Sequence, residues 1–202
     1  HNAQEHIIWP YDFANVSNID KSLEEFLFKQ EIRVSRFVHC AGILDIIPVR
    51  MITNENLLTV LNVNFISAAM ITTCLVKKKV NEHFLKSIVF VSSIASEFGT
   101  KGFAAYSASK GALDSYMRSA AVELAPRVRV NSVLPGGIVT KMTENLYNDD
   151  EIAERLVKDY PLGMGKASDI VEIVQFLLSD KARWITGQQF VVDGGRTANI
   201  SA

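Results

Sequence analysis

The fold is decided by one stretch of the sequence, in which Ser87-Ile88-Val89-Phe90-Val91-Ser92 is followed by a helical segment over residues 103–125 and then by Val128-Arg129-Val130-Asn131-Ser132-Val133-Leu134. Pro126 ends the helical segment because proline cannot continue a helix. Both short runs are mostly apolar, which is typical of strands covered on both faces of a parallel sheet. A strand, a helix and a strand at this spacing form a right-handed βαβ unit. The stretch therefore predicts an α/β protein.

The same alternation extends outward from this stretch in both directions. It predicts, in chain order, a strand over residues 6–9, a helix over 17–30, a strand over 36–40, a long helix from 53 to the Lys77-Lys78-Lys79 cluster, helices over 150–159 and 168–179, and a last strand over 190–192. Ser17 with Asp20 fits a capping box, and Thr53 is a suitable cap for the long helix. We expect residues 1–202 to form a single Rossmann-type domain, a three-layer doubly wound parallel sheet.

The composition narrows the possible partners and the setting. The 21 basic and 22 acidic residues give a formal net charge of -1, which favours neither nucleic acid nor an acidic membrane surface as a partner. The two cysteines, Cys40 and Cys74, form no disulfide framework, and a reducing, cytoplasmic setting is expected. The sequence has no run of 18 apolar residues, so it predicts no transmembrane helix. The four histidines share no metal-ligand spacing, so no metal site is expected.

Ligands of an open α/β sheet bind beyond the carboxyl ends of its strands, so the residues that follow each strand are candidates for a site. These residues are Ala41-Gly42, Ser92-Ser93 and Pro135-Gly136-Gly137-Ile138. Tyr106 and Lys110 lie four residues apart on a helix and therefore share one face. An ammonium group beside a phenol lowers the pKa of the phenol and makes it a usable acid or base.

These residues, taken together, resemble a known enzyme family. Ser93, Tyr106-Ser107-Ala108-Ser109-Lys110, Asn131-Ser132-Val133-Leu134-Pro135-Gly136, Ile185-Thr186-Gly187-Gln188 and Val192-Asp193-Gly194-Gly195 resemble the short-chain dehydrogenase/reductase family in order and spacing. The resemblance runs from about Trp9 to the end of the chain, and it is closest to the 3-oxoacyl-carrier-protein reductase type. It implies an oxidoreductase that moves a hydride between the nicotinamide of NAD or NADP and a small carbonyl or alcohol substrate.

The resemblance also implies roles for individual residues. Tyr106 would be the proton donor to a substrate carbonyl or the base toward an alcohol, and Ser93 would hold the carbonyl oxygen. Lys110 would lower the pKa of Tyr106 and bind the ribose hydroxyls of the cofactor. Asn64 matches the helix asparagine that anchors a proton-relay water.

Further positions match the cofactor site of the family. Asp12 matches an acidic residue near the adenine ring. Ile138 and Thr140 match positions that hold the nicotinamide carboxamide. The remaining expected cofactor contacts are Cys40, Ala41, Gly42, Tyr106, Lys110, Pro135 and Gly136.

Structural alternatives to these roles stay open at the level of sequence. Asn64 could be a helix-surface residue, and Asp12 could be a turn residue after a strand. Ser93 and Tyr106 could be structural polar residues. Cys40 is expected to be a small buried filler and not a reactive thiol.

Two departures from the family pattern affect these expectations. His39-Cys40 stands where the family usually has two asparagines, so we expect the end of that strand to be held less firmly. No Gly-x-x-x-Gly-x-Gly motif follows any strand, so the phosphate-binding unit of the family, with its first two strands and about 45 residues, is expected to be absent from this chain. The sequence therefore does not indicate a choice between NAD and NADP, and the mixed composition of residues 142–162 does not indicate a substrate.

The loss of two central strands would leave the strand over residues 6–9 without a neighbour. A longer polypeptide, pairing of that strand beside Phe37-Val38, or cover from a second chain would each resolve this. An alternative function also follows, in which the chain is a truncated, non-catalytic relative that serves as an oligomerisation or interaction module. Under either function we expect a homodimer or homotetramer, built from the two long helices and the C-terminal strand region. Residues 142–162 are expected to cover the substrate.

Overall fold

The centre of the molecule is a sheet of four parallel strands. The computed structural model describes residues 6–143 and 158–199. The strands are β1 (Arg36–His39), β2 (Ser87–Val91), β3 (Arg129–Pro135) and β4 (Gln189–Val192), and they lie side by side in that order. Each pair is parallel and in register, with Val89 opposite Val38 and Asn131. The carboxyl ends of all four strands therefore meet at one edge of the sheet.

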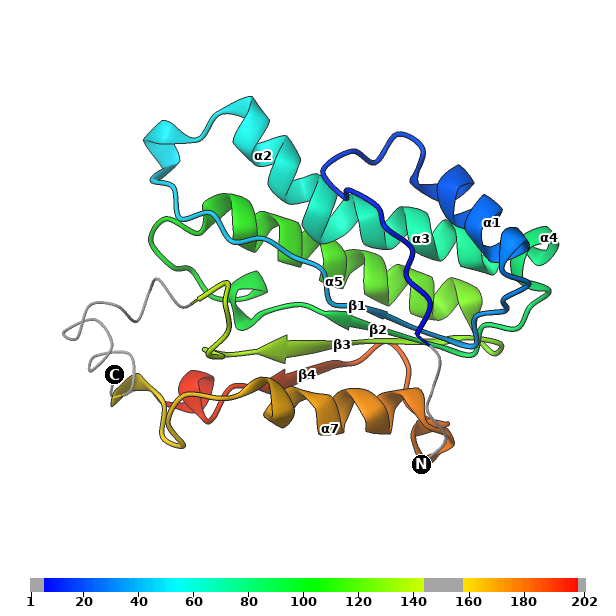
Figure 1. Ribbon diagram of the computed structural model, residues 1–202. Helices are drawn as coiled ribbons and strands as arrows, with labels where there is room; N and C mark the ends of the chain where they lie inside the picture. The colour runs from blue at the N-terminus through cyan, green and yellow to red at the C-terminus, as the bar shows by residue number, and fades with distance from the viewer. Residues whose placement is uncertain (1–5, 144–157, 200–202) are drawn as a thin grey trace.

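Helices cover both faces of this sheet, which confirms the expected three-layer arrangement (Figure 1). One face carries α1 (Ile19–Lys29), α5 (Ala104–Leu124) and a long helical run made of α2 (Asn54–Leu61), a π-helical turn (Asn62–Ile66) and α3 (Ser67–Val76), which the short α4 (Lys78–Asn81) follows. The other face carries α7 (Ala167–Leu178). Short 3-10 turns lie at Val49–Met51, Ile94–Ser96, Asp180–Ala182 and Arg196–Ala198. The helix predicted over residues 150–159 lies almost wholly outside the described residues.

Each face of the sheet has its own apolar core. Phe90 of β2 and Leu113 and Met117 of α5 are fully buried in the larger core, between the sheet and three helices. Val133 of β3 and Leu177 of α7 are fully buried in the smaller core, on the other face. Burying a large apolar side chain stabilises a fold by about 1.5–3 kcal/mol, so these two layers fix the sheet between its helices.

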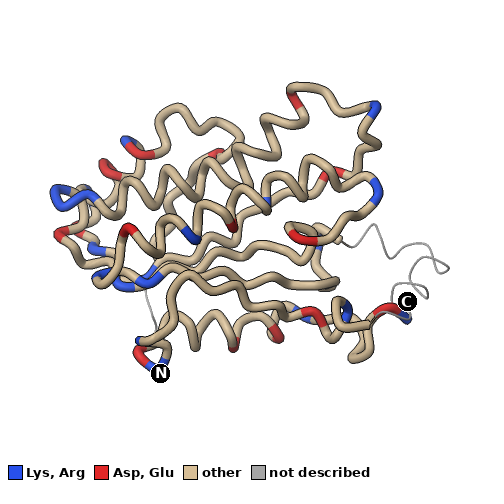
Figure 2. The backbone as a smooth tube through the Cα atoms, turned by 180° about the vertical axis from the view of Figure 1, so that it is seen from behind, with Lys and Arg blue, Asp and Glu red and all other residues tan. Residues whose placement is uncertain are grey.

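Charged residues are nearly absent from the strands and lie mainly on helices and turns (Figure 2). The exceptions are Arg36 and Arg129, the first residues of β1 and β3. Arg36 Nε donates to the Leu178 carbonyl at 2.8 Å, and the Arg129 guanidinium donates to the carbonyls of Leu177 and Ser179 at 2.7 and 3.0 Å. Cations suit the last carbonyls of a helix, so these two arginines stabilise the end of α7.

The long helical run from Asn54 to Val76 is the core helix on its face of the sheet. Thr53 caps it as expected, with its hydroxyl accepting the amide hydrogen of Asn56 at 3.2 Å. The run has 23 residues, and its most apolar 18-residue window has a mean hydropathy of 1.7, so it is long and apolar enough to cross a membrane, although it contains no uninterrupted run of 18 apolar residues. Half of its most apolar window is buried inside the fold, where α3 packs on α1 and α2 on α5. Buried core helices commonly meet the same criteria.

The predicted first strand is wrong. Residues 6–9 form no strand and join no sheet, and Ile8 is 79% exposed. The segment is instead fixed by Trp9, whose Nε1 donates to Ser22 Oγ of α1 at 3.1 Å and whose ring stacks on Tyr11. Strand-forming residues need a neighbouring strand to satisfy their backbone groups, and β1 is an edge of the described sheet that this segment does not pair with.

The predicted capping box at Ser17 is also wrong. Helix α1 begins at Ile19 with Asn18 as its cap, and no side chain caps it. The Ser17 hydroxyl donates to Asn15 Oδ1 at 2.7 Å instead, because the chain makes a turn before the helix begins.

The end of β1 is tied to the long helix by a buried histidine. His39 is 2% exposed, and its Nε2 lies 2.8 Å from Ser67 Oγ. The Ser67 hydroxyl donates to the Val63 carbonyl at 2.7 Å, so it accepts from His39 and fixes the Nε2–H tautomer. His39 thus supplies a contact where the sequence suggested a weaker strand end. Burial, and secondarily the charge of Lys110, lowers the pKa of His39 to about 4.

This pKa predicts a specific loss of stability in mild acid. The unfolded chain binds a proton on His39 below about pH 6.5, whereas the folded chain resists it down to about pH 4. Stability should therefore fall as the pH drops from 6.5 to 4, by on the order of 3 kcal/mol from this residue. Urea unfolding at pH 7.5 and pH 4.5 measures it. The pH-dependent loss should be smaller in His39→Asn and unchanged in His83→Asn, an exposed control; equal losses in all three proteins would contradict the assignment.

Candidate active site

Two adjoining cavities lie at the carboxyl edge of the sheet. One has a volume of about 520 Å³ and the other about 420 Å³. Six residues line both, and so form the wall between them: Ser93, Tyr106, Gly136, Ile138, Met142 and Thr143. The loops after β2 and β3 and the first turn of α5 thus converge as the strand-end argument predicts.

Ser93 is positioned by the turn that follows β2. Its hydroxyl oxygen accepts the amide hydrogen of Ala95 at 3.1 Å and caps the 3-10 turn Ile94–Ser96. This contact leaves the hydroxyl hydrogen available as a donor. A hydrogen bond from Ser93 to the Tyr106 hydroxyl lowers the pKa of that phenol.

Tyr106 and Lys110 lie on the same face of α5, as their spacing predicts. The Lys110 ammonium nitrogen is 5.7 Å from the centroid of the Tyr106 ring and donates to the Val91 carbonyl at 2.9 Å. Burial lowers the pKa of Lys110 to about 8, against smaller opposing effects of Asp114 and Cys40. Lys110 is therefore a buried amine whose pKa lies closer to neutral pH than that of a free lysine.

The expected lowering of the Tyr106 pKa by Lys110 is not what the structure gives. Burial raises the pKa of Tyr106 above its usual value, and only Ser93 acts in the opposite direction. The Lys110 ammonium group lies over the ring and donates to a backbone carbonyl, and it has no resolved effect on the pKa of Tyr106. The pKa of Tyr106 therefore lies above that of a free phenol in this structure.

Asn64 is fully buried inside the π-helical turn, which excludes the helix-surface alternative. Its Oδ1 accepts from the Ile43 amide at 2.8 Å, and its Nδ2 donates to the Ile43 carbonyl and to Ser109 Oγ at 3.0 and 2.9 Å. The side chain thus fastens the turn after β1 to the long helix and to α5. A Cβ on Gly42 would lie 3.4 Å from Asn64 Oδ1 and 3.5 Å from Lys110 Nζ, so this turn passes close to both.

The turn after β3 needs its glycines because other side chains approach its backbone. A Cβ on Gly136 would lie 2.8 Å from the Asp193 side chain, and one on Gly137 would lie 3.0 Å from the Tyr160 hydroxyl. The Gly137 amide donates to that hydroxyl at 2.8 Å. Tyr160 is thereby fixed as part of the wall of the larger cavity.

The smaller cavity collects most of the residues expected to contact a cofactor. Of the predicted set, it is lined by Cys40, Gly42, Tyr106, Lys110, Pro135, Gly136, Ile138 and Thr140. Ala41 and Asp12 do not line it; the Asp12 carboxylate accepts from the Ala14 amide at 2.9 Å in an exposed turn. Cys40 is exposed and not a buried filler, because it follows the last residue of an edge strand and faces the cavity.

This cavity fits the nicotinamide half of a dinucleotide. Lys110 is 4% exposed and has three N–H donors, and a buried ammonium group needs oxygen partners such as ribose hydroxyls. The other walls of the smaller cavity are apolar residues of α7 and the strands, among them Ile170, Val174 and Val91. Apolar walls of this kind suit a flat ring. The sequence given contains no Gly-x-x-x-Gly-x-Gly motif after a strand.

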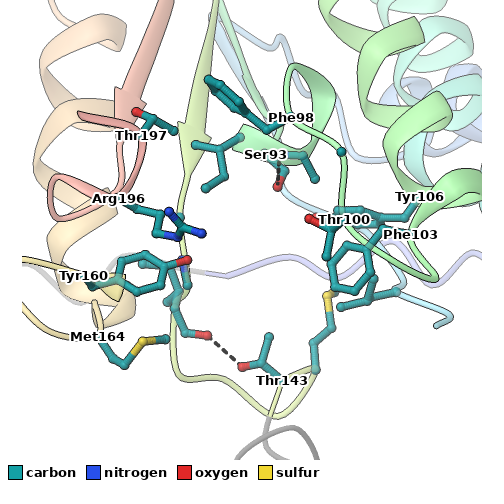
Figure 3. Close-up of a pocket in the computed structure, with 18 of the residues that line it drawn as sticks. Ser93, Phe98, Thr100, Phe103, Tyr106, Thr143, Tyr160, Met164, Arg196 and Thr197 are labelled. Carbon is teal, nitrogen blue, oxygen red and sulfur yellow. Dashed lines mark hydrogen bonds between the residues drawn. The ribbon is translucent and has the colours of Figure 1, made fainter. Parts of the chain in front are cut away.

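The larger cavity contains residues that strand-end reasoning from the sequence overlooked (Figure 3). Phe98, Phe103 and Met164 give it apolar walls, and Tyr160 and Arg196 point into it. Arg196 follows Gly194-Gly195 directly after β4, so the strand-end rule applied to this last strand could have found it. Tyr160 and Met142 lie in the segment expected to cover the substrate, of which residues 144–157 are outside the described residues.

Comparisons with known sequences agree with this site. Residues 1–197 match the family model described as Enoyl-(Acyl carrier protein) reductase. The chain is 36% identical to cyclopentanol dehydrogenase of Comamonas sp. (strain NCIMB 9872) over 192 residues, which is 93% of this chain and 75% of that protein. It is also 36% identical to 3-oxoacyl-[acyl-carrier-protein] reductase of Thermotoga maritima over 191 residues, 92% of this chain and 76% of that protein.

A solved structure shares the fold. A mutant 4-hydroxyisoleucine dehydrogenase complexed with NADH and succinate superposes with a TM-score of 0.87 at 31% identity, over 94% of this chain and 78% of that one. The four parallel strands and flanking helices described above thus form a fold that this dehydrogenase shares. On these grounds the chain belongs to the short-chain dehydrogenase/reductase family, whose oxidoreductases use NAD or NADP.

Proposed function

We propose that this chain moves a hydride between nicotinamide and a carbonyl or alcohol substrate, with Tyr106 as the group that donates or accepts the proton. The observation that carries the proposal is the shared wall. Ser93 and Tyr106 line both cavities, so a substrate in the larger one and a nicotinamide in the smaller one meet beside them. Bound in this way, the cofactor supplies the hydride.

In this proposal, the side chains of the protein orient the substrate carbonyl and donate the proton to its oxygen. The Ser93 hydroxyl, aimed by its bond to Ala95, donates to the carbonyl oxygen and holds it beside Tyr106. Tyr106, protonated near neutral pH, donates its phenol proton to that oxygen during reduction. Lys110 would hold the ribose hydroxyls. Asn64 acts as a positioning residue, and we also propose that it anchors the water from which Tyr106 regains its proton.

Replacement of Tyr106 tests the proton-donor role. Tyr106→Phe removes only the hydroxyl and should reduce kcat by about 10²–10⁴-fold, the usual contribution of general acid catalysis. Reduction of small ketones and aldehydes with NADH and NADPH measures it, and circular dichroism checks the fold. Tyr116→Phe is the matched control, since Tyr116 is half-buried on the same helix, against Phe65 and Phe90, and lines neither cavity. Full activity in Tyr106→Phe would refute the role.

Binding of the cofactor separates this function from its rival. The rival is a non-catalytic relative that serves as an oligomerisation or interaction module. Lys110→Met should weaken NADH or NADPH binding by more than 10-fold, because a buried donor to the ribose is lost. Titration by nicotinamide fluorescence measures it, with Arg118→Met, an exposed cation on α5, as control. If the folded wild-type chain binds neither nucleotide, the rival is favoured.

We also propose that the chain forms a homodimer or homotetramer in the cytoplasm. Large apolar side chains are exposed on the long helices and near the C-terminal strand, with Leu58 47%, Val122 81% and Trp184 96% exposed. Such groups are typical of surfaces that a second copy covers. The two described cysteines, Cys40 and Cys74, are both free, which suits a reducing compartment.

A charge introduced at Val122, on the exposed face of α5, tests this association. Val122→Glu should shift the sedimentation profile toward smaller species, because a carboxylate would be buried between copies. Val49→Glu is the control, since Val49 is 72% exposed but lies on a 3-10 turn outside the proposed interface. A monomeric wild-type chain, or equal effects of both substitutions, would contradict the proposal.

A further inference from the structure

The described lining of the larger cavity carries one charge and is otherwise apolar or neutral. Among the described residues that line it, Arg196 is the only charged one. Apolar side chains such as Phe98, Phe103 and Met164 form much of the rest. A cation in a cavity of this composition attracts an anionic group strongly, because the low polarity of the surroundings weakens electrostatic screening.

Arg196 is held rigidly by the turn from which it projects. Gly194 and Gly195 both have positive φ, at 59° and 86°, and the Asp193 carboxylate accepts the amide hydrogens of Gly195 and Thr197 at 3.0 and 2.7 Å. A Cβ on Gly195 would lie 3.1 Å from Pro161, so the turn is packed against that proline. The backbone of Arg196 is thus fixed before any ligand arrives, which lowers the entropic cost of binding.

The side chain points into the cavity from the wall that faces the reacting groups. Figure 3 shows the guanidinium group beside Tyr160, across the cavity from Tyr106 and Phe103. The Arg196 side chain is 34% exposed, and one of its nitrogens lies 3.4 Å from the Asp159 carboxylate. A guanidinium group has five N–H donors, so this long contact leaves donors for a bidentate partner.

We propose that the substrate carries a carboxylate, as an oxo acid or the corresponding hydroxy acid, and that Arg196 binds this carboxylate while Ser93 and Tyr106 hold the reacting oxygen. The inference rests on the proposed function and names its substrate class. A carboxylate suits the site better than a phosphate: the described lining offers one cation, and Asp159 beside it repels a doubly charged group more strongly. The apolar walls between the two ends accept the carbon chain of the acid.

Matched pairs of acids and esters test this specificity. The wild-type chain should reduce 3-oxo and 4-oxo acids with a kcat/KM about 10- to 100-fold above that of their methyl esters, the range expected for a charged hydrogen-bonded pair. Arg196→Met should abolish this preference by raising KM for the acids far more than for the esters. Equal losses for acids and esters, or a wild-type chain without preference, would overturn the inference.

The Asp159 contact supplies the matched control. If Arg196 served only to fasten the C-terminal turn through Asp159, then Asp159→Asn should lower activity as Arg196→Met does. If Arg196 binds the substrate, Asp159→Asn removes a competing carboxylate and should keep or strengthen the preference for acids.

A binding measurement keeps this inference separate from the proposed function. Butyrate and butyramide have no reducible carbonyl, and their binding to the full chain can be followed by saturation-transfer NMR without turnover. Butyrate should bind the wild-type chain and not Arg196→Met, and butyramide should bind neither well. A chain that turns over no carbonyl but binds butyrate through Arg196 refutes the hydride-transfer function alone. A chain that reduces esters but does not bind butyrate refutes the carboxylate site alone.

Discussion

The buried ammonium group of Lys110 is the constraint on which the geometry of the site depends. A cation out of contact with water is costly unless oxygens surround it, and the carbonyl of Val91 at 2.9 Å meets part of that need. Val91 is the last residue of β2. The bond therefore ties α5 to the end of the strand that Ser93 follows, and it sets Tyr106, one helical turn before Lys110, beside Ser93.

The two cavities divide the electrostatic work between two cations. Lys110 lines only the smaller cavity and Arg196 only the larger one, and the wall that contains Tyr106 stands between them. The two cations also lie on different kinds of element. Lys110 lies on the core helix α5, whereas Arg196 lies on a short turn after the edge strand β4. The first position is set by the packing of the core, whereas the second depends on a local turn whose residues can vary without disturbing the sheet.

The sequence predicted most of the fold and much of the wall between the two cavities, for identifiable reasons. The strands β1 to β4 and the helices α5 and α7 were predicted to within about two residues, because continuous apolar runs and helical periodicity reflect burial directly. The first strand failed because strand propensity without a partner strand forms no ladder, which a local pattern cannot reveal. The predictions that the pKa of Tyr106 is lowered and that Cys40 is buried were wrong, because both properties depend on the three-dimensional surroundings of the side chain. Arg196 was not predicted because it follows β4, whereas the predicted site residues other than Asp12 lie at or after the ends of the other three strands or on helices.

The two arginines at the starts of β1 and β3 have a mechanical consequence for the smaller cavity. They hold α7 at its last carbonyls, while the other end of the helix, with Ala167, Ile170 and Val171, forms the cavity floor. The 12 residues of α7 span about 18 Å, so a tilt of about 10° around the held end displaces Ala167 by about 3 Å. The angle between α7 and the sheet therefore sets the width of the smaller cavity, because the arginines hold the helix at the end that lies far from the cavity.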